Sequence, residues 1–227
     1  MVSGSSAELL ERVTAFEELN LKGGEVILDI GAGILRNGLY AFEKGADVVM
    51  GIDPIPGMLK VGKKKATDKG FGGKVDVVVA DARFIPCRYE TFDASISLEV
   101  LEHIPVDADK VFREIFRVLK PGGRVVVNTW SAVTCVRDRR RKNAGYFKDD
   151  FYYKFYLPGE FKTLLENIDF KMKKIRGHSF TLLNGALKRV NLPNSLKLEL
   201  AIERATRNYI PLLSILLGQY LIVNVEK

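Results

Sequence analysis

The stretch VILDIGAGILRNGLY, residues Val26 to Tyr40, joins an apolar run, an acid, two glycines one residue apart and an amphipathic segment. The apolar run predicts a buried strand, the glycines a tight turn, and the amphipathic segment a helix that begins directly after the turn. Open α/β folds bind ligands at such junctions. Nicotinamide dinucleotides, nucleoside triphosphates and S-adenosylmethionine are all bound at turns of this kind, so the turn alone does not decide among them.

The segments around this turn alternate between predicted strands and predicted helices. Apolar runs predict strands at residues 25–30, 46–53, 74–82, 92–101, 124–130, 169–177 and 219–227, and helical patterns occupy residues 5–19, 36–45, 55–69, 107–120 and 157–168. The first five strands are continuously apolar rather than alternating, which is typical of a parallel sheet with helices on both faces. The sequence therefore predicts an α/β fold.

The composition is that of an ordinary globular protein, with 47% hydrophobic and 28% charged residues in 227. We expect one domain over residues 1–227. No apolar signal-peptide segment follows the start, and Cys87 and Cys135 lack the spacing of a zinc site or a disulfide framework, which predicts a reduced, cytoplasmic protein. The apolar run at 209–223 is about fifteen residues and is interrupted by Pro211 and Gly218, whereas a membrane span needs roughly 20.

Positive charge is concentrated in the C-terminal part of the chain. Residues 1–130 contain 17 Lys and Arg against 19 Asp and Glu, whereas residues 131–227 contain 18 against 9. Within this part, residues 137–156 combine a basic run with seven aromatic side chains. Such a composition can bind phosphates and stack on bases, or it can form a lid whose aromatic rings pack on the domain.

Two of the three ligand classes require motifs that the turn does not have. A dinucleotide turn has the pattern G-x-G-x-x-G, but Arg36 occupies the third glycine position after Gly31 and Gly33. A triphosphate loop needs a lysine and a hydroxyl after its last glycine, but Leu39–Tyr40 follows Gly38. Both classes are therefore disfavoured.

Three acids follow three successive predicted strands, where an adenosine ligand would need them. Asp53 could accept hydrogen bonds from both ribose hydroxyls, and Asp81 could accept one from the adenine amino group beside the Ala82 amide. Asp29 could hold an ammonium group directly or through water. Each acid alone could instead cap a helix or close a turn. Three acids at the same edge of one sheet favour a ligand.

The chain resembles the class I S-adenosylmethionine-dependent methyltransferases, a group that includes small-molecule and tRNA methyltransferases. The matching segments are LDIGAGILRNG, GIDPIPGML, VADARFIP, FDASISLEVLEHI and VLKPGGRVVVNTW, with weaker matches in LPGEFKTLLENIDFKMKKIRG and GQYLIVNVEK. The resemblance implies a Rossmann-like seven-stranded mixed sheet whose last strand is antiparallel and pairs with residues 169–177. It also implies helices on both faces and a helical insertion before the last strand.

The resemblance also implies which residues bind the cofactor, S-adenosylmethionine. From the methionine end to the adenine, they are Asp29, Gly31, Ala32, Gly33, Leu98, Glu99, Asp53, Pro54, Met58, Asp81, Ala82 and Arg83. Leu35 stands where many members of the family have a third glycine. We therefore expect its side chain to narrow the methionine pocket without blocking it.

The catalytic group is not identified by the sequence. Methyl transfer from a sulfonium needs an aligned nucleophile, and a base only where the acceptor must lose a proton. The candidates near the end of the fourth strand are Glu99, Glu102 and His103, of which His103 is expected to be structural rather than catalytic. His178 is expected on the surface at the start of the insertion. No spacing of ligands suggests a metal.

The predicted organisation comprises a cofactor-binding core at 1–130, a basic and aromatic loop at 131–157 and a helical, substrate-side insertion at 178–216. An apolar helical insertion suits a closed pocket, which favours a small-molecule acceptor. The alternative is a tRNA or RNA methyltransferase that uses its basic C-terminal half, since tRNA wobble-uridine methyltransferases have a stretch similar to FYYKFYLPGE. A third interpretation is a non-catalytic module that binds the cofactor. The sequence does not indicate an oligomeric state.

Overall fold

A computed structural model describes residues 6–104, 106–137, 145–148, 151–180 and 195–227. The main sheet contains β1 (Val26–Ile30), β2 (Val48–Asp53), β3 (Val75–Val79), β4 (Phe92–Leu98), β5 (Leu119–Trp130), β8 (Lys171–Phe180) and β9 (Gly218–Glu226). The helices are α1 (Ser6–Leu19), α2 (Arg36–Glu43), α3 (Pro56–Asp68), α4 (Ala108–Val118), α5 (Ala132–Arg137), α6 (Pro158–Glu166), α8 (Ser195–Tyr209) and α9 (Pro211–Leu217), with short 3-10 turns η1 (Gly72–Lys74) and η2 (Leu101–His103).

The seven strands form one mixed sheet in the order β3-β2-β1-β4-β5-β9-β8. Strands β1 to β5 are parallel, and β9 is antiparallel between β5 and β8. The predicted fold class is confirmed. Because all five parallel strands end at one edge, the segments after β1, β2 and β4 lie together there.

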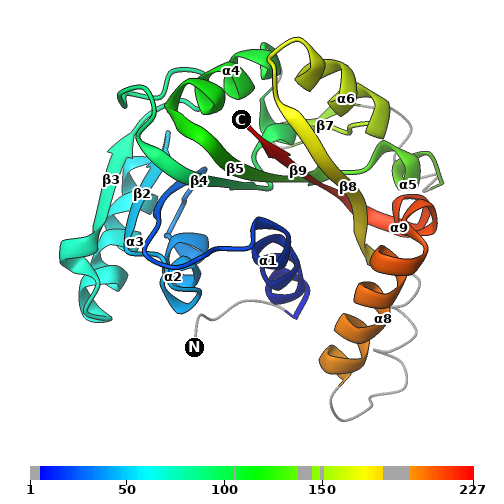
Figure 1. The fold of residues 1–227 in the computed structure, drawn as a ribbon, viewed down its shortest axis with the longest axis horizontal. Coiled ribbons are helices and arrows are strands. Elements are labelled where there is room, and N and C mark those ends of the chain that lie inside the picture. Colours follow the sequence, from blue (N-terminus) through cyan, green and yellow to red (C-terminus); the bar gives the residue numbers. More distant parts are fainter. Residues whose placement is uncertain (1–5, 105, 138–144, 149–150, 181–194) are drawn as a thin grey trace.

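Helices cover both faces of the sheet (Figure 1). On one face α4 and α6 bury an apolar core that includes an edge-to-face contact between Phe112 and Phe161, whose ring centroids are 6.2 Å apart. On the other face α1, α2 and α3 bury a second core around Ile27, Val49 and Ile96. This burial on two sides explains why the strands have continuous rather than alternating apolar residues.

The helices α8 and α9 form the insertion before β9 and contact α1 and β8. Arg207 of α8 pairs with Glu17 and Glu18 of α1 at 3.2 and 3.6 Å, and Arg204 also pairs with Glu17. On the sheet side, the backbone of α9 lies so close to Gly177 that a methyl group there would overlap the Ser214 carbonyl oxygen. The insertion is therefore attached both to α1 and to the edge strand.

Two predictions for the C-terminal part need correction. Residues 131–157, predicted as an aperiodic loop, contain α5 and a two-stranded sheet of β6 (Gly145–Lys148) and β7 (Phe151–Lys154). The insertion begins after Phe180, because β8 extends through His178, which is fully buried rather than on the surface. The arginine run at 139–141 lies outside the described residues.

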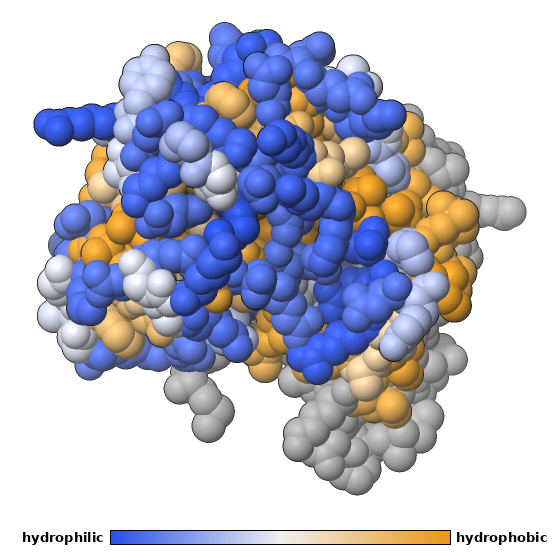
Figure 2. Space-filling view, in the orientation of Figure 1, coloured by the Kyte–Doolittle hydropathy of each residue, from blue (hydrophilic) through white to orange (hydrophobic). Residues whose placement is uncertain are grey.

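Apolar side chains are exposed where α8 meets α9. They are Tyr209, Ile210, Leu212, Leu213 and Leu216, and Figure 2 shows apolar residues gathered on the right-hand side, where these helices lie in Figure 1. Within the part of the chain that the structure describes, no helix is both long and apolar enough to span a membrane.

Candidate cofactor and acceptor site

The carboxylate of Asp53 joins the end of β2 to the glycine turn. Its Oδ2 accepts a hydrogen bond from the Gly33 amide and its Oδ1 accepts one from the Ile55 amide, both at 2.9 Å. Each carboxylate oxygen keeps a second lone pair, which a ribose hydroxyl can use. Asp53 thus braces the turn, and its predicted contact with ribose is compatible with this geometry.

The turn itself requires glycine at two positions. Gly31 and Gly33 have φ values of +66° and +50°, which side chains rarely adopt. A methyl group on Gly31 would also overlap Val100 Cγ2, whereas one on Gly33 would lie 3.4 Å from Met58 Cε. The Ala32 amide between them donates to the Ile52 carbonyl at 2.9 Å, so the turn is fixed to β2.

Asp29 lies behind the turn and is fully buried. Its Oδ2 accepts a 2.9 Å hydrogen bond from the Gly38 amide in the first turn of α2. Burial raises the pKa of Asp29 to about 7, against the opposing effect of its hydrogen bonds to Gly38 and Asn37. In this structure Asp29 therefore caps α2, and its predicted contact with the methionine moiety stays a prediction.

Leu35 does not face a ligand as expected. It has a φ of +61° and is completely buried, and it packs where glycines leave room for it. A methyl group on Gly51 or Gly62 would come within 2.6 or 2.9 Å of its side chain. The missing family glycine is thus explained by an inward-facing leucine, and the expectation that Leu35 narrows the methionine pocket is wrong.

Leu35→Gly is consequently expected to affect stability more than ligand binding. Removing a buried leucine costs about 2–5 kcal/mol, and about 1 kcal/mol is recovered because glycine tolerates the positive φ. Urea unfolding should therefore show a loss of about 1–4 kcal/mol. A variant as stable as the parent, with S-adenosylhomocysteine binding abolished, would contradict this inward packing.

Asp81 follows β3 and pairs with Arg83. Two guanidinium nitrogens of Arg83 approach the Asp81 carboxylate at 2.6 and 3.0 Å, and the Arg83 amide donates to it at 2.8 Å. The side-chain hydrogen bonds from Arg83 hold the pKa of Asp81 below its usual value. Asp81 is therefore an ionised acceptor, the state that a hydrogen bond from an adenine amino group requires.

Apolar side chains around these acids are exposed, as an adenine-binding surface requires. Ile55 and Met58 beside Asp53 are 50% and 42% exposed, and Phe84 beside Asp81 is 67% exposed. A glycine turn, an acid braced against it, a second ionised acid and this apolar surface all fit S-adenosylmethionine. Pro54 and Ala82 lie at the same strand ends, so both stay in the candidate set.

A second group of acids comes from α1 and from the segment after β4. Glu102 of η2 is almost fully buried and accepts a 3.0 Å hydrogen bond from the Thr129 hydroxyl. Glu11 of α1 is also buried and accepts a hydrogen bond from the Asn128 amide at the end of β5. Glu99 has a φ of +54° and interacts electrostatically with both. We call Glu11, Glu99 and Glu102 the carboxyl cluster.

Burial and mutual repulsion favour the neutral, protonated forms of Glu102 and Glu11. Burial, with the negative charge of Glu99 adding to it, raises the pKa of Glu102 to about 8. Burial and the charges of Glu99 and Glu102 also raise the pKa of Glu11 well above its usual value. His103, the other catalytic candidate, is exposed on η2, and Leu98 lies buried just before Glu99.

This raised pKa predicts how stability depends on pH. A carboxyl group whose folded pKa exceeds its unfolded value stabilises the fold while it is protonated, and the stabilisation is lost as pH rises towards the folded value. Between pH 5 and 8, Glu102 is expected to lower the free energy of unfolding by about 1 kcal/mol per pH unit. Glu102→Gln should flatten this slope in urea titrations at several pH values; an unchanged slope would contradict it.

Three aromatic side chains cross the sheet next to the carboxyl cluster. Trp130 of β5 is opposite Tyr220 of β9, which is opposite His178 of β8. The Tyr220 ring centroid lies 5.7 Å from that of Trp130 and 5.2 Å from that of His178. The Tyr220 hydroxyl donates to Glu99. Trp130, Tyr220 and His178 form what we call the aromatic row.

Sequence reasoning missed most of these residues because they come from distant segments. From the sequence, Glu11 belongs only to an amphipathic helix and Tyr220 only to a strand. Their proximity depends on the antiparallel insertion of β9 beside β5 and on α1 packing over that strand. The presence of the short polar sequence Asn128–Thr129 inside an apolar strand was the one available signal.

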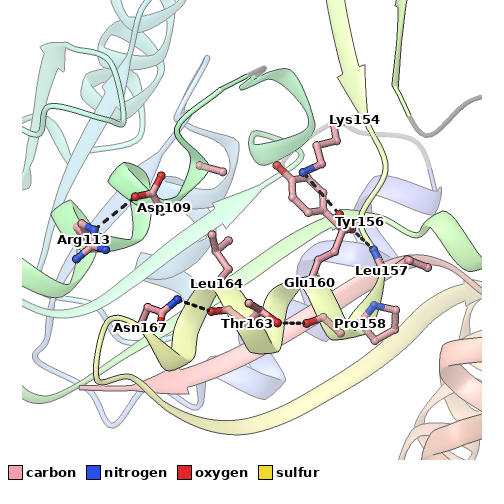
Figure 3. Close-up of a pocket in the computed structure, with 12 residues that line it drawn as sticks. Asp109, Arg113, Lys154, Tyr156, Leu157, Pro158, Glu160, Thr163, Leu164 and Asn167 are labelled. Atoms are coloured by element: carbon pink, nitrogen blue, oxygen red, sulfur yellow. Dashed lines mark hydrogen bonds and ion pairs between the residues drawn. The ribbon is translucent and has the colours of Figure 1, made fainter.

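A separate cavity of about 850 Å³ lies between α4 and α6 (Figure 3). Arg113 and Asp109 on one side pair at 3.5 Å, and Lys154 and Glu160 on the other pair at 3.7 Å. Its charges are thus neutralised locally. The residues that line it include none of the carboxyl cluster, so we do not assign it to the candidate site. Among the residues described, no group of three or more His, Cys, Asp or Glu is arranged to hold a metal ion.

Comparisons with known proteins agree with this geometry. Residues 28–127 match the family model described as a methyltransferase domain. The chain is 35% identical over 133 residues to the ubiquinone/menaquinone biosynthesis C-methyltransferase UbiE of Teredinibacter turnerae, covering 58% of this chain and 53% of that protein. It is 38% identical over 123 residues to a tRNA (carboxymethyluridine(34)-5-O)-methyltransferase of Arabidopsis thaliana, covering 53% and 28%. The chain thus spans about half or less of the length of these relatives.

Comparison with solved structures also points to a methyltransferase fold. A structure of an S-adenosylmethionine-dependent methyltransferase from Mesorhizobium loti superposes with a TM-score of 0.70 at 17% identity, with all of both chains covered. The sheet order and the matched domain define a Rossmann-like methyltransferase fold. Residues 28–127 therefore form a methyltransferase domain of the class I S-adenosylmethionine-dependent type, a family whose cofactor is S-adenosylmethionine.

Proposed function

We propose that the protein transfers a methyl group from S-adenosylmethionine to a small molecule by in-line displacement. The observation that carries the choice of a small molecule is the burial of the polar groups next to the cofactor edge. Glu11 of α1, its partner Asn128 and Glu102 are each at most 6% exposed. An acceptor that reaches these groups has to fit beneath a helix, which suits a small molecule better than a nucleotide within a folded RNA.

When bound, S-adenosylmethionine supplies an electrophilic methyl group on a positively charged sulfur. The protein's part is to hold that group and to align the acceptor with it. In this proposal Gly31 and Gly33 let the backbone approach the methionine moiety, Asp53 accepts from the ribose, and Asp81 accepts from the adenine. Glu99 directly follows β4, and from there its side chain can lie close to the sulfonium and the acceptor.

A second candidate is an RNA methyltransferase. Two observations favour it, the excess of positive charge in residues 131–227 and the similarity to a tRNA methyltransferase from Arabidopsis thaliana. Against it, Phe155 and Tyr156 of the basic and aromatic segment are buried and cannot stack on bases. The Phe155 ring packs 5.5 Å from that of Trp130.

The two candidates differ in how binding depends on salt. If the basic half binds RNA, affinity for bulk tRNA should fall with salt with a log–log slope of about −0.7 per phosphate contacted. Replacing Arg139, Arg140 and Arg141 by Ala should then reduce the slope by about two units. For a small-molecule enzyme we expect weak tRNA binding and no change in the slope.

Methyl transfer itself can be measured with S-adenosylmethionine labelled on its methyl group. Purified tRNA and a tRNA-free metabolite extract are supplied separately as acceptors. Label in the extract supports the small-molecule proposal. Label in tRNA that is lost in the arginine triple variant would replace it with the RNA candidate, and no transfer to either acceptor would favour a non-catalytic module.

A further inference from the structure

Several buried polar atoms near the aromatic row have no hydrogen-bond partner within the described residues. They are Glu102 Oε1, Asn128 Oδ1 and both ring nitrogens of His178. All three side chains are at most 1% exposed. A buried polar group without a partner costs about 1–3 kcal/mol, so a group that supplies hydrogen bonds is expected to bind here.

These unpartnered atoms adjoin the carboxyl cluster. The Asn128 side chain donates to Glu11 through its nitrogen, which leaves its oxygen beside that carboxyl. Glu102 belongs to the cluster and is bound on its other oxygen by Thr129. When Glu102 is ionised, these available atoms are hydrogen-bond acceptors, apart from the single N–H of a neutral His178. A ligand that donates several hydrogen bonds matches them.

The charge around the cluster also favours a cation. Three carboxyl groups interact there, and the charged groups that act on Glu11 besides Glu99 and Glu102 are Glu8 and Arg12 of α1. The Arg12 Nε donates to the Asn37 side chain at 3.2 Å, and Arg207, whose positive charge acts on His178, is paired with Glu17 and Glu18. A bound cation would favour ionisation of the cluster, whereas an anion would be repelled by its ionised carboxylates.

The aromatic row provides a second feature that cations prefer. Tyr220 and Trp130 are half-buried, so their rings are accessible in part, and the Tyr220 hydroxyl is already bound to Glu99. Aromatic faces beside carboxylates attract ammonium groups through both the ring quadrupole and the negative charge. His178 stacks on Tyr220 with an angle of 18° between the rings and fixes the far end of the row.

From this juxtaposition we infer that the methyl acceptor is a small-molecule amine, bound as its ammonium ion between the carboxyl cluster and the aromatic row. The inference rests on the proposed function and names its substrate class. The ammonium donates to Glu102 Oε1 and Asn128 Oδ1, and Tyr220 lies beneath the carbon next to the nitrogen.

The chemistry of this assignment balances without another reactant. The ammonium nitrogen gives one proton to the Glu102 carboxylate, which frees its lone pair. The nitrogen then forms a bond to the methyl carbon as the carbon–sulfur bond breaks, and the sulfur keeps the bonding electrons. The product is a methylated ammonium and neutral S-adenosylhomocysteine, and Glu102 releases its proton to solvent.

The test uses three probes of equal size but different charge: benzylamine, benzyl alcohol and benzoate. Each is titrated by calorimetry into the full chain saturated with S-adenosylhomocysteine, so that the sulfonium charge is absent. We expect benzylamine to bind at least about tenfold more tightly than benzyl alcohol, and benzoate not to bind. The preference for the amine should increase between pH 6 and pH 8.5, as the cluster ionises.

Substitutions in the cluster separate this role from a structural one. Glu102→Gln and Glu11→Gln keep the shape of each side chain and should each reduce the preference for benzylamine over benzyl alcohol by about tenfold, without loss of S-adenosylhomocysteine affinity. Glu166→Gln, an exposed acid on α6, should change nothing.

Three results would overturn the inference while leaving the proposed function intact. These are equal or tighter binding of benzyl alcohol or benzoate, no binding by any probe, and an amine preference that persists in both glutamine variants. Failure of S-adenosylhomocysteine to saturate the protein would instead refute the proposed function, and the amine assignment would fall with it.

Discussion

Asp53→Ala is expected to weaken the binding of S-adenosylhomocysteine by about 100-fold, which corresponds to about 2.7 kcal/mol. The carboxylate has two roles in our account. It holds the Gly33 and Ile55 amides at 2.9 Å, and it is proposed to accept hydrogen bonds from the ribose. Hydrogen bonds to charged groups contribute about 1.5–3 kcal/mol each. Removing the support of the turn together with the ribose contact should therefore cost more binding free energy than the loss of one hydrogen bond.

A matched control is Asp76→Ala, which removes an exposed acid from β3, the strand next to β2. This variant should bind with unchanged affinity. Calorimetric titration of the parent and both variants measures the difference directly. An Asp53→Ala variant that binds as tightly as the Asp76→Ala control would remove Asp53 from the site.

Gly31→Ala is expected to have the other large effect, a loss of about 2–5 kcal/mol in the free energy of unfolding. Two physical costs add here. A side chain at a φ of +66° costs about 1–2 kcal/mol, and the new methyl group would overlap Val100, which costs about 1–3 kcal/mol more. Because Gly31 lies in the turn, S-adenosylhomocysteine affinity should fall as well.

Two further variants separate these costs. Gly70→Ala places a methyl group at a φ of +83° with no atom within 4 Å, so it should show the backbone cost alone. Gly31→Ala combined with Val100→Ala removes the overlap but not the backbone cost, and should recover part of the loss that Gly31→Ala causes. If urea unfolding shows that Gly31→Ala loses no more free energy of unfolding than Gly70→Ala, the inferred close contact between the turn and Val100 is wrong.

The fold could be predicted from the sequence because its signals are local and repeated. Continuously apolar strands alternating with amphipathic helices indicate a covered parallel sheet, and the order of motifs from Val26 to Trp130 identifies the family. The antiparallel position of the last strand came from the resemblance rather than from its own residues. The sequence of residues 219–227 does not indicate which strands pair with it.

The site could be predicted only where its residues directly follow strands. Asp53 and Asp81 are such residues, and the structure brings both to the same edge as Gly31 and Gly33. His178 was misjudged because a histidine next to a glycine in a basic segment has no local sign of burial. Its position opposite Tyr220 depends on the pairing of β8 with β9.

Leu35 shows how tertiary packing changes the meaning of a motif. From the sequence, a leucine in place of a glycine suggests a narrower ligand pocket. In the structure, the space for its side chain comes from Gly51 on β2 and Gly62 on α3, which are 16 and 27 residues away in the chain. The residues of the turn alone do not indicate that these distant glycines leave space for the leucine.

The central claim is that the carboxyl edge of the sheet, with Asp53 and Asp81, binds S-adenosylmethionine and not a nicotinamide dinucleotide. Parallel calorimetric titrations of the full chain with S-adenosylhomocysteine and with NAD measure this most directly. We predict saturable binding of S-adenosylhomocysteine at one site per chain and no measurable heat from NAD. Tight binding of NAD together with no binding of S-adenosylhomocysteine would contradict the account.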